Sequence, residues 1–271
     1  MDLTRELETA RRLALEAGRI LLEFYDLPHD IELKQGSEPV TAADKAANQA
    51  IVAGLLDAFP EDGILAEETP DSAKRLDRNR LWVVDPMDGT KEFIKKNGEF
   101  SVMIGLAVDG RPAVGVVYQP TARRMFAASA GAGAYLETPD GRSGPLTVSD
   151  TADTRDMSVA ISRSHRSERI DSVRQALGIE REVRSGSVGL KIGLICERQC
   201  DLYIHPSPHT KQWDTCAPEA ILTEAGGRMT DLEGNAFVYN RTDLYNRNGI
   251  LATNGRAHDE ILERVSAVFA S

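Results

Sequence analysis

The chain has 271 residues, of which 41% are hydrophobic, and a formal net charge of −10. This length allows a large core, built either as one extended domain or as two closely packed halves. The negative charge argues against a nucleic-acid surface, which requires clustered Lys and Arg, and no apolar run approaches the roughly 20 residues of a membrane span. We therefore expect neither a nucleic acid nor a membrane as a partner. The charged residues of the N-terminal segment argue against a signal peptide.

Two helices are predicted before residue 60. Apolar residues recur every three or four positions over 3–25, which is typical of an amphipathic helix. A second helix is predicted from Thr41, with Asp44 three residues later as in a capping box, until Pro60. Asp44 therefore has two explanations, as a helix cap and as a site residue.

The pattern then changes to strands. The segments 81–84, 101–108, 113–118 and 125–129 are β-rich, and Asp109-Gly110 is a hairpin turn signal, so we expect an antiparallel meander. After residue 150 strands and helices alternate, which predicts an α/β half. The expected organisation is thus an N-terminal half, residues 1–150, and a C-terminal half, residues 151–271. The C-terminal elements are expected at 157–162, 169–177, 188–198, 201–205 and 214–224.

Three cysteines, Cys196, Cys200 and Cys216, indicate reduced thiols and predict a cytoplasmic location. Cys196 and Cys200 have helical i, i+4 spacing near two histidines, so a zinc site must be considered. Because Cys196 continues an apolar row, we favour its interpretation as a small buried hydrophobic side chain.

The most informative motif is WVVDPMDGT at 82–90, where an apolar strand ends in Asp85 and Asp88. Pro86 and Gly89 constrain the backbone between and after these acids. Carboxylates gathered beside a rigid turn and a hydroxyl suit a hard divalent cation and predict magnesium-dependent phosphate chemistry. An ordinary turn would use the same residue types. Phosphatases with a covalent aspartyl nucleophile space their acids two apart; the spacing of three here favours shared metal ligation through a turn.

Two other segments carry acids that extend this pattern. Glu67 and Glu68 follow a short apolar run, and Asp214 follows Trp213 in the first turn of a predicted helix. Taken alone, the two glutamates are as typical of a solvated surface as of a functional site. Asp214 taken alone is as typical of a helix cap.

Together these segments resemble the inositol monophosphatase superfamily, which comprises lithium-sensitive, magnesium-dependent phosphomonoesterases. The resemblance rests on Glu67-Glu68, on D-P-x-D-G-T at 85–90, and on Trp213-Asp214 followed by E-A-G-G at 224–227. It covers nearly the full chain and implies a layered αβαβα sandwich, of α+β or α/β class, with two or three Mg²⁺ ions. The metal ligands that it implies are Glu67, Asp85, the carbonyl of Met87, Asp88 and Asp214.

The resemblance also implies how water attacks the phosphate. Thr90, Asp44 and Glu67 would orient and deprotonate the water, and metal coordination would lower its pKa so that no covalent nucleophile is needed.

Substrate choice is predicted from other residues. Lys91-Glu92-Phe93, Ser162-Arg163-Ser164-His165 and the glycine-rich segment 186–191 are similar to the 3′(2′),5′-bisphosphate nucleotidases. A glycine loop entering a helix offers N–H groups and a positive dipole end to a second phosphate, and Lys191 adds charge. The implied substrate-binding residues are Gly89, Thr90, Ser162, His165, Ser187, Lys191 and Asp214.

The resemblance thus predicts hydrolysis of the 3′-phosphate of adenosine 3′,5′-bisphosphate, and of its sulfated relative. The compact segment between Glu67 and Asp85 leaves inositol phosphates, fructose 1,6-bisphosphate and histidinol phosphate as alternative substrates. A non-catalytic metal- or anion-binding module is the alternative from another class. The sequence leaves open whether the protein is a homodimer.

Overall fold

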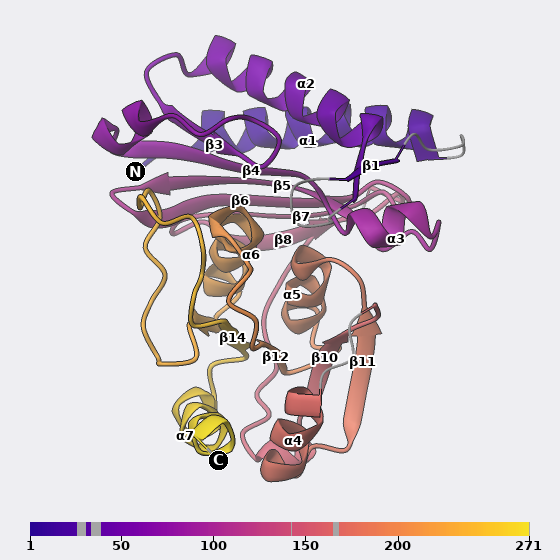
Figure 1. The fold of residues 1–271 in the computed structure, drawn as a ribbon, viewed down its shortest axis with the longest axis vertical. Coiled ribbons are helices and arrows are strands. Elements are labelled where there is room, and N and C mark those ends of the chain that lie inside the picture. Colours follow the sequence, from indigo (N-terminus) through magenta and orange to yellow (C-terminus); the bar gives the residue numbers. More distant parts are fainter. Residues whose placement is uncertain (26–30, 34–38, 142, 165–167, 271) are drawn as a thin grey trace.

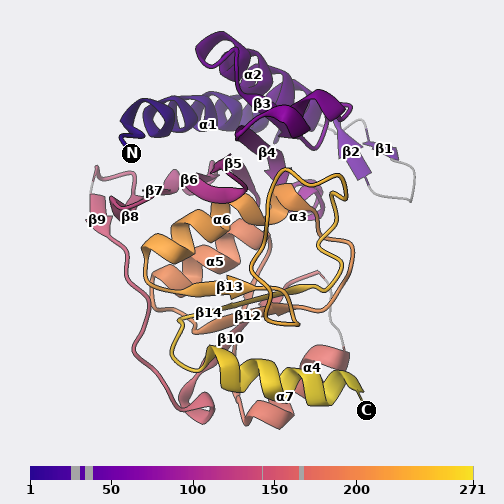
Figure 2. The same ribbon diagram turned by 90° about the vertical axis from the view of Figure 1, so that its left-hand side faces the viewer.

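The computed structural model describes residues 1–25, 31–33, 39–141, 143–164 and 168–270. Helices and sheets alternate in five layers (Figures 1 and 2). Helices α1 (Thr4–Tyr25) and α2 (Ala42–Ala58) cover the outer face of a seven-stranded sheet, and α5 (Val188–Cys196) and α6 (Gln212–Glu224) separate it from a five-stranded sheet. Helices α4 (Glu168–Leu177) and α7 (His258–Ala270) cover the far face of the smaller sheet. The expected layered αβαβα sandwich is confirmed.

The larger sheet runs in the order β3-β4-β5-β6-β7-β8-β9. Only the β3–β4 pair is parallel, and the remaining strands form the expected antiparallel meander. Asp109 and Gly110 both have positive φ, 49° and 75°, as a tight hairpin turn of the primed type requires. The strands are β3 (Gly63–Ala66), β4 (Arg80–Asp88), β5 (Ser101–Val108), β6 (Arg111–Gln119), β7 (Arg124–Ser129), β8 (Gly133–Glu137) and β9 (Ser143–Pro145).

The smaller sheet runs in the order β11-β10-β12-β14-β13. Strand β10 pairs in parallel with both of its neighbours, whereas β14 is antiparallel to both β12 and β13. The bounds are β10 (Ser158–Ser162), β11 (Arg181–Ser185), β12 (Leu202–His205), β13 (Arg228–Thr230) and β14 (Ile250–Thr253). The short helix α3 (Thr90–Ile94), two 3₁₀ turns (Ala73–Asp77 and Thr154–Asp156) and the β1–β2 pair (Ile31–Leu33, Pro39–Thr41) complete the structure.

Strand β4 is buried on both faces, and its residues alternate between two cores. Trp82 and Val84 pack in the cluster formed with α1 and α2, while Leu81 and Val83 pack in the cluster formed with α5 and α6. Since successive side chains of a strand point to opposite faces, Asp85 continues the face that meets α6. The hydrophobic pattern of β4 thereby directs this carboxylate into the middle of the molecule.

Two glycines let α6 approach the larger sheet closely. Gly105 and Gly115 are direct cross-strand partners on β5 and β6. A Cβ at Gly105 would lie 2.8 Å from Cys216 Sγ, and one at Gly115 would lie 2.3 Å from the carbonyl oxygen of Ala217. Both contacts fall below any that a real Cβ makes, so only glycine allows α6 to lie here.

The cysteines are buried, each with at most 1% of its surface exposed, and burial raises the pKa of all three thiols. The interpretation of Cys196 as a small buried side chain is confirmed. The predicted helix over 188–198 ends at Cys196, so Cys200 lies beyond it and the i, i+4 relation does not exist. In the described part of the chain, no helix is both long and apolar enough to cross a membrane.

Candidate metal centre and active site

Asp85 and Asp88 lie on one strand, not on a turn after it, because β4 continues to Asp88. Asp85 pairs with Met103 and Asp88 with Ser101, so three steps along β4 oppose two steps along β5. The extra residue in β4 forms a β-bulge. In a regular strand, side chains three residues apart point to opposite faces, and the bulge removes this difference. The bulge therefore brings both carboxylates to the same face of the sheet. The expectation that β4 ends at Val84 was wrong.

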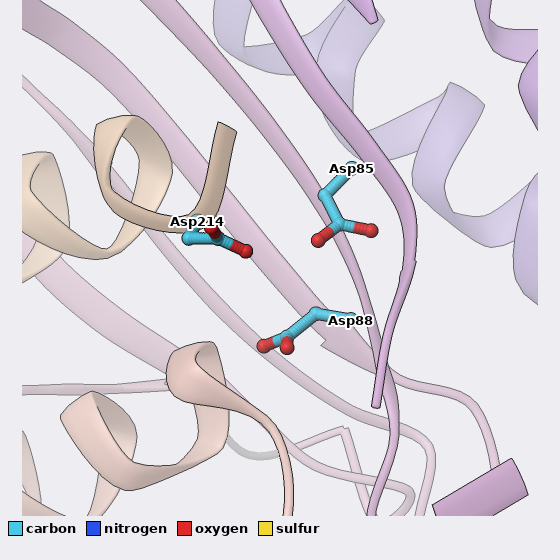
Figure 3. A group of neighbouring side chains, drawn as sticks. All are labelled: Asp85, Asp88 and Asp214. Atoms are coloured by element: carbon cyan, nitrogen blue, oxygen red, sulfur yellow. The ribbon is translucent and has the colours of Figure 1, made fainter. Parts of the chain in front are cut away.

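Asp214 approaches these acids from the opposite side, in the first turn of α6. Carboxylate oxygens of Asp85, Asp88 and Asp214 lie within 4.8 Å of one another, and Figure 3 shows the three side chains directed into one space. The N–H of Lys211 donates to Asp214 Oδ2 at 2.6 Å. This bond satisfies one donor at the helix start and orients the carboxylate.

The three carboxylates are in an environment that disfavours their charge. Burial, followed by the negative charge of Glu67, raises the pKa of Asp85 well above its usual range, and Asp44 contributes to the same shift. Burial and the charges of Glu67 and Asp88 raise the pKa of Asp214 to about 8. Five acids therefore interact electrostatically, and like charges that interact in this way are unfavourable without a cation.

The arrangement fits a divalent cation that prefers oxygen ligands. It offers several convergent carboxylates, and a bound cation would offset both the burial and the like charges that raise their pKa values. Of the predicted metal ligands, Asp85, Asp88 and Asp214 bring their carboxylate oxygens together. Glu67 interacts with this group electrostatically, since its charge raises the pKa of Asp214. The N–H of Met87 donates to Asp85 Oδ1 at 3.0 Å, which orients that carboxylate.

The residues predicted to handle the attacking water surround the same place. Asp44 is fully buried in the first turn of α2 and acts on Asp85 through its charge. Thr90 is the first residue of α3, and its hydroxyl lies 3.4 Å from the carbonyl oxygen of Met87. Gly89, with a φ of 102°, makes the turn between β4 and α3. These roles stay predictions.

The loop before α5 and the first turn of that helix direct their hydrogen-bond donors at Asp88. Ser187 Oγ donates to Asp88 Oδ2 at 2.5 Å, and the N–H of Gly189 donates to the same oxygen at 2.9 Å. Ser101 Oγ lies 2.9 Å from Ser187 Oγ and links β5 to this contact. Burial raises the pKa of Asp88, whereas Lys191 and these donors lower it.

Lys191 is 3% exposed, and its Nζ donates to the carbonyl oxygens of Gly186 and Ser187 at 2.9 and 2.7 Å. Burial lowers its pKa to about 8, against the opposing effect of Asp88. The same ammonium group lies 5.0 Å from the centre of the Tyr203 ring. The predicted role of Lys191 in substrate binding stays a prediction, but its present contacts hold the loop together.

Of the remaining predicted substrate residues, Ser162 lies at the end of the smaller sheet. Ser162 closes β10 and pairs with Ser185 of β11, one residue before Gly186. His165 lies outside the described residues. The support given to Asp88 by Gly189, and by Ser101 through Ser187, was not predicted from the sequence, because nothing in the chain links these segments before folding.

Comparison with known proteins identifies the class of protein that this fold and acidic centre represent. The model of the inositol monophosphatase family matches residues 2–269. The chain is 38% identical over 250 residues to the 3′(2′),5′-bisphosphate nucleotidase CysQ of Salmonella typhimurium, covering 91% of this chain and 99% of that one. It is 34% identical over 269 residues to the histidinol-phosphatase of Mycobacterium tuberculosis, covering 98% of both.

Solved structures agree. The crystal structure of CysQ from Bacteroides thetaiotaomicron, described as a bacterial member of the inositol monophosphatase family, superposes with a TM-score of 0.78 at 32% identity, covering 92% of this chain and 97% of that one. The chain belongs to the inositol monophosphatase family.

Proposed function

We propose that the chain is a magnesium-dependent phosphomonoesterase that hydrolyses adenosine 3′,5′-bisphosphate to AMP and phosphate, and accepts 3′-phosphoadenylyl sulfate. The observation that carries this proposal is the convergence of Asp85, Asp88 and Asp214 within 4.8 Å, in a chain whose relatives include bisphosphate nucleotidases. Magnesium prefers such oxygen ligands. The coarser conclusion, that the chain is a phosphatase, rests on its family and relatives.

Asp85, Asp88 and Asp214 would hold the cations, with Glu67 and the carbonyl of Met87 as further ligands. Two or three bound Mg²⁺ ions would neutralise the phosphoryl oxygens and lower the pKa of a water molecule. The bulge in β4 and the contact of α6 with the sheet fix the carboxylates before any substrate binds. This preorganisation reduces the reorganisation that the reaction requires.

Thr90 would hold the attacking water through its hydroxyl, and Asp44 or Glu67 would accept its proton. A carboxylate can take up a proton from water only when it is ionised, and bound cations would favour the ionised form of these acids. Thr90 begins α3 directly after the metal-binding strand, so the water and the cations would be positioned by one continuous segment.

Phosphate esters of sugars or polyols are the second candidate class of substrate. The observation in favour is the 34% identity to a histidinol-phosphatase over 98% of both chains. An inositol monophosphatase from the same family, that of Anabaena, shares the fold at 29% identity. The metal centre alone would not distinguish these esters, because they share the phosphate group that it would bind.

A substrate panel tests the proposal. Phosphate release is measured with adenosine 3′,5′-bisphosphate, inositol 1-phosphate, fructose 1,6-bisphosphate and histidinol phosphate, with and without Mg²⁺ and with millimolar lithium. We expect the bisphosphate to give the highest kcat/KM, an absolute requirement for Mg²⁺, and inhibition by lithium. Higher kcat/KM with another ester would refute the substrate assignment and leave the phosphatase class intact.

Variants test the site itself. Asp88→Asn should abolish phosphate release, whereas Asp259→Asn, which alters an exposed acid on α7 paired with Arg228, should leave it unchanged. If the wild-type chain binds Mg²⁺ but releases phosphate from no ester, it is a non-catalytic binding module.

A further inference from the structure

We propose that Glu92, Glu99, Arg163, Ser164 and Gly186 form a latch that positions the substrate-binding segments against the metal centre and thereby determines affinity for the nucleotide. The proposal rests on the proposed function, since it concerns how that site selects its substrate. Glu92 and Glu99 belong to the segment that follows strand β4. Arg163 and Ser164 directly follow β10, and Gly186 directly follows β11. These are positioning residues, and none is required to touch the reacting phosphate.

Glu99 holds two segments of the C-terminal half at once. Arg163 donates to it in a fork, from Nε to Oε2 and from a terminal nitrogen to Oε1, both at 2.5 Å. The N–H of Gly186 donates to Glu99 Oε2 at 2.7 Å. Arg163 also donates to the carbonyl oxygen of Arg184 at 2.9 Å, which joins the end of β10 to the end of β11. One carboxylate thus fixes the ends of both strands relative to β5.

Glu92 makes the second attachment. It is 5% exposed on α3, and Ser164 Oγ donates to its Oε1 at 2.5 Å. Lys95 Nζ contacts the same hydroxyl at 3.0 Å. The hydrogen bond from a hydroxyl to a buried carboxylate is short and directional. Hydrogen bonds to charged groups are about twice as strong as those between neutral groups. Ser164 is therefore tied to the helix that begins with Thr90.

Close packing at Gly186 shows that the two halves meet directly here. A Cβ at this position would lie 2.4 Å from the carbonyl oxygen of Glu99 and 2.5 Å from Glu92 Cγ. No larger residue fits without separating the segments. Ser187, which donates to Asp88, follows Gly186 immediately, so the latch and the metal centre share one loop.

The ion pair between Arg163 and Glu99 lies beside two predicted substrate residues. Its side chains are 42% and 22% exposed, so solvent weakens the pair, although the fork geometry keeps part of its contribution to folding stability. In the chain, Arg163 directly follows Ser162 and Gly186 directly precedes Ser187, and both serines are predicted to bind substrate. The bonds of Arg163 and Gly186 to Glu99 therefore hold both serines relative to the same carboxylate. The geometry points to a consequence for substrate affinity.

Steady-state kinetics on purified variants test this inference. Arg163→Gln and Glu99→Gln are expected to raise KM for adenosine 3′,5′-bisphosphate about tenfold, equivalent to about 1.4 kcal/mol, with kcat little changed. Their effect on para-nitrophenyl phosphate, which has no nucleoside, should stay within about twofold. The double variant should be no worse than either single variant, because both break the same unit. Arg163→Lys, which keeps the charge and loses the fork, should fall in between.

Arg174→Gln is the matched control. It removes a comparable ion pair, with Glu182 at 2.8 Å, in the same half of the chain. It should leave both KM values unchanged. Equal losses with both substrates, or no change in KM with either, would overturn the proposal. If the wild-type enzyme does not hydrolyse the bisphosphate, the proposed function fails, and the same comparison is made between the best ester of the panel and para-nitrophenyl phosphate.

Discussion

Replacing Gly115 with alanine should move the helix that carries Asp214 and weaken the metal centre. The new Cβ would lie 2.3 Å from the carbonyl oxygen of Ala217, whereas ordinary contacts begin at 3.4 Å. The helix must therefore shift by about 1 Å, because a packed interior has no space to absorb the methyl group. Overpacking of this kind typically costs about 1–3 kcal/mol of folding free energy.

The functional consequence follows from the position of Asp214 near the start of the same helix. Displacement of a catalytic constellation by about 1 Å can reduce the rate about 100-fold. We expect Gly115→Ala to need more Mg²⁺ for half-maximal activity, and excess Mg²⁺ to recover part of the loss. The assay is phosphate release at saturating substrate over a range of Mg²⁺ concentrations, together with thermal unfolding with and without Mg²⁺.

Gly144→Ala is the matched control, since Gly144 also lies in the larger sheet but a methyl group added there would have nothing within 4 Å. It should behave like the wild-type chain in both assays. An unchanged Mg²⁺ requirement in Gly115→Ala, alongside lower thermal stability, would refute the link between the glycine contact and the position of Asp214.

Three further outcomes follow from the site and its surroundings. Ser187→Ala removes a 2.5 Å bond to Asp88 and should weaken Mg²⁺ binding about tenfold, as measured by calorimetry, because bonds to charged groups contribute about 1.5–3 kcal/mol. Asp85→Asn should unfold at a higher temperature than the wild type in EDTA but should gain no stability from Mg²⁺, because burial and the charge of Glu67 disfavour the Asp85 carboxylate, which is a predicted metal ligand. Burial lowers the pKa of His258 to about 4, so the unfolded chain binds a proton before the folded chain does. Stability should therefore fall between about pH 6.5 and 4, and denaturant unfolding should show a smaller fall in His258→Gln.

Local periodicity predicted most of the elements that carry the site. The apolar spacing over 3–25 corresponds to α1, and the β-rich segments after residue 81 correspond to β4 through β7. These patterns are strong because each element buries one defined face or, for β4, both faces. The strands β13 and β14 and the helix α7 were not predicted. Strands β13 and β14 have three and four residues, which is too short for a period-2 pattern to stand out.

The convergence of the acids could not be derived from spacing alone. Asp85 and Asp88 are three residues apart, which would place them on opposite faces of a regular strand. A turn was expected to bring them together, but the structure uses a bulge within β4 opposite Met103 and Ser101. A bulge depends on the partner strand, so it is a property of the sheet and not of the segment.

The loop before α5 shows what a local motif does specify. Its glycines, its serine and the start of a helix predict a site for an anion, and the expected anion was a substrate phosphate. In the structure, Ser187 and Gly189 donate to the carboxylate of Asp88. The motif therefore specifies the donors and their direction but not the acceptor. Because the anion that these donors bind is itself a predicted metal ligand, removing the Ser187 hydroxyl should alter metal affinity before it alters the choice of substrate.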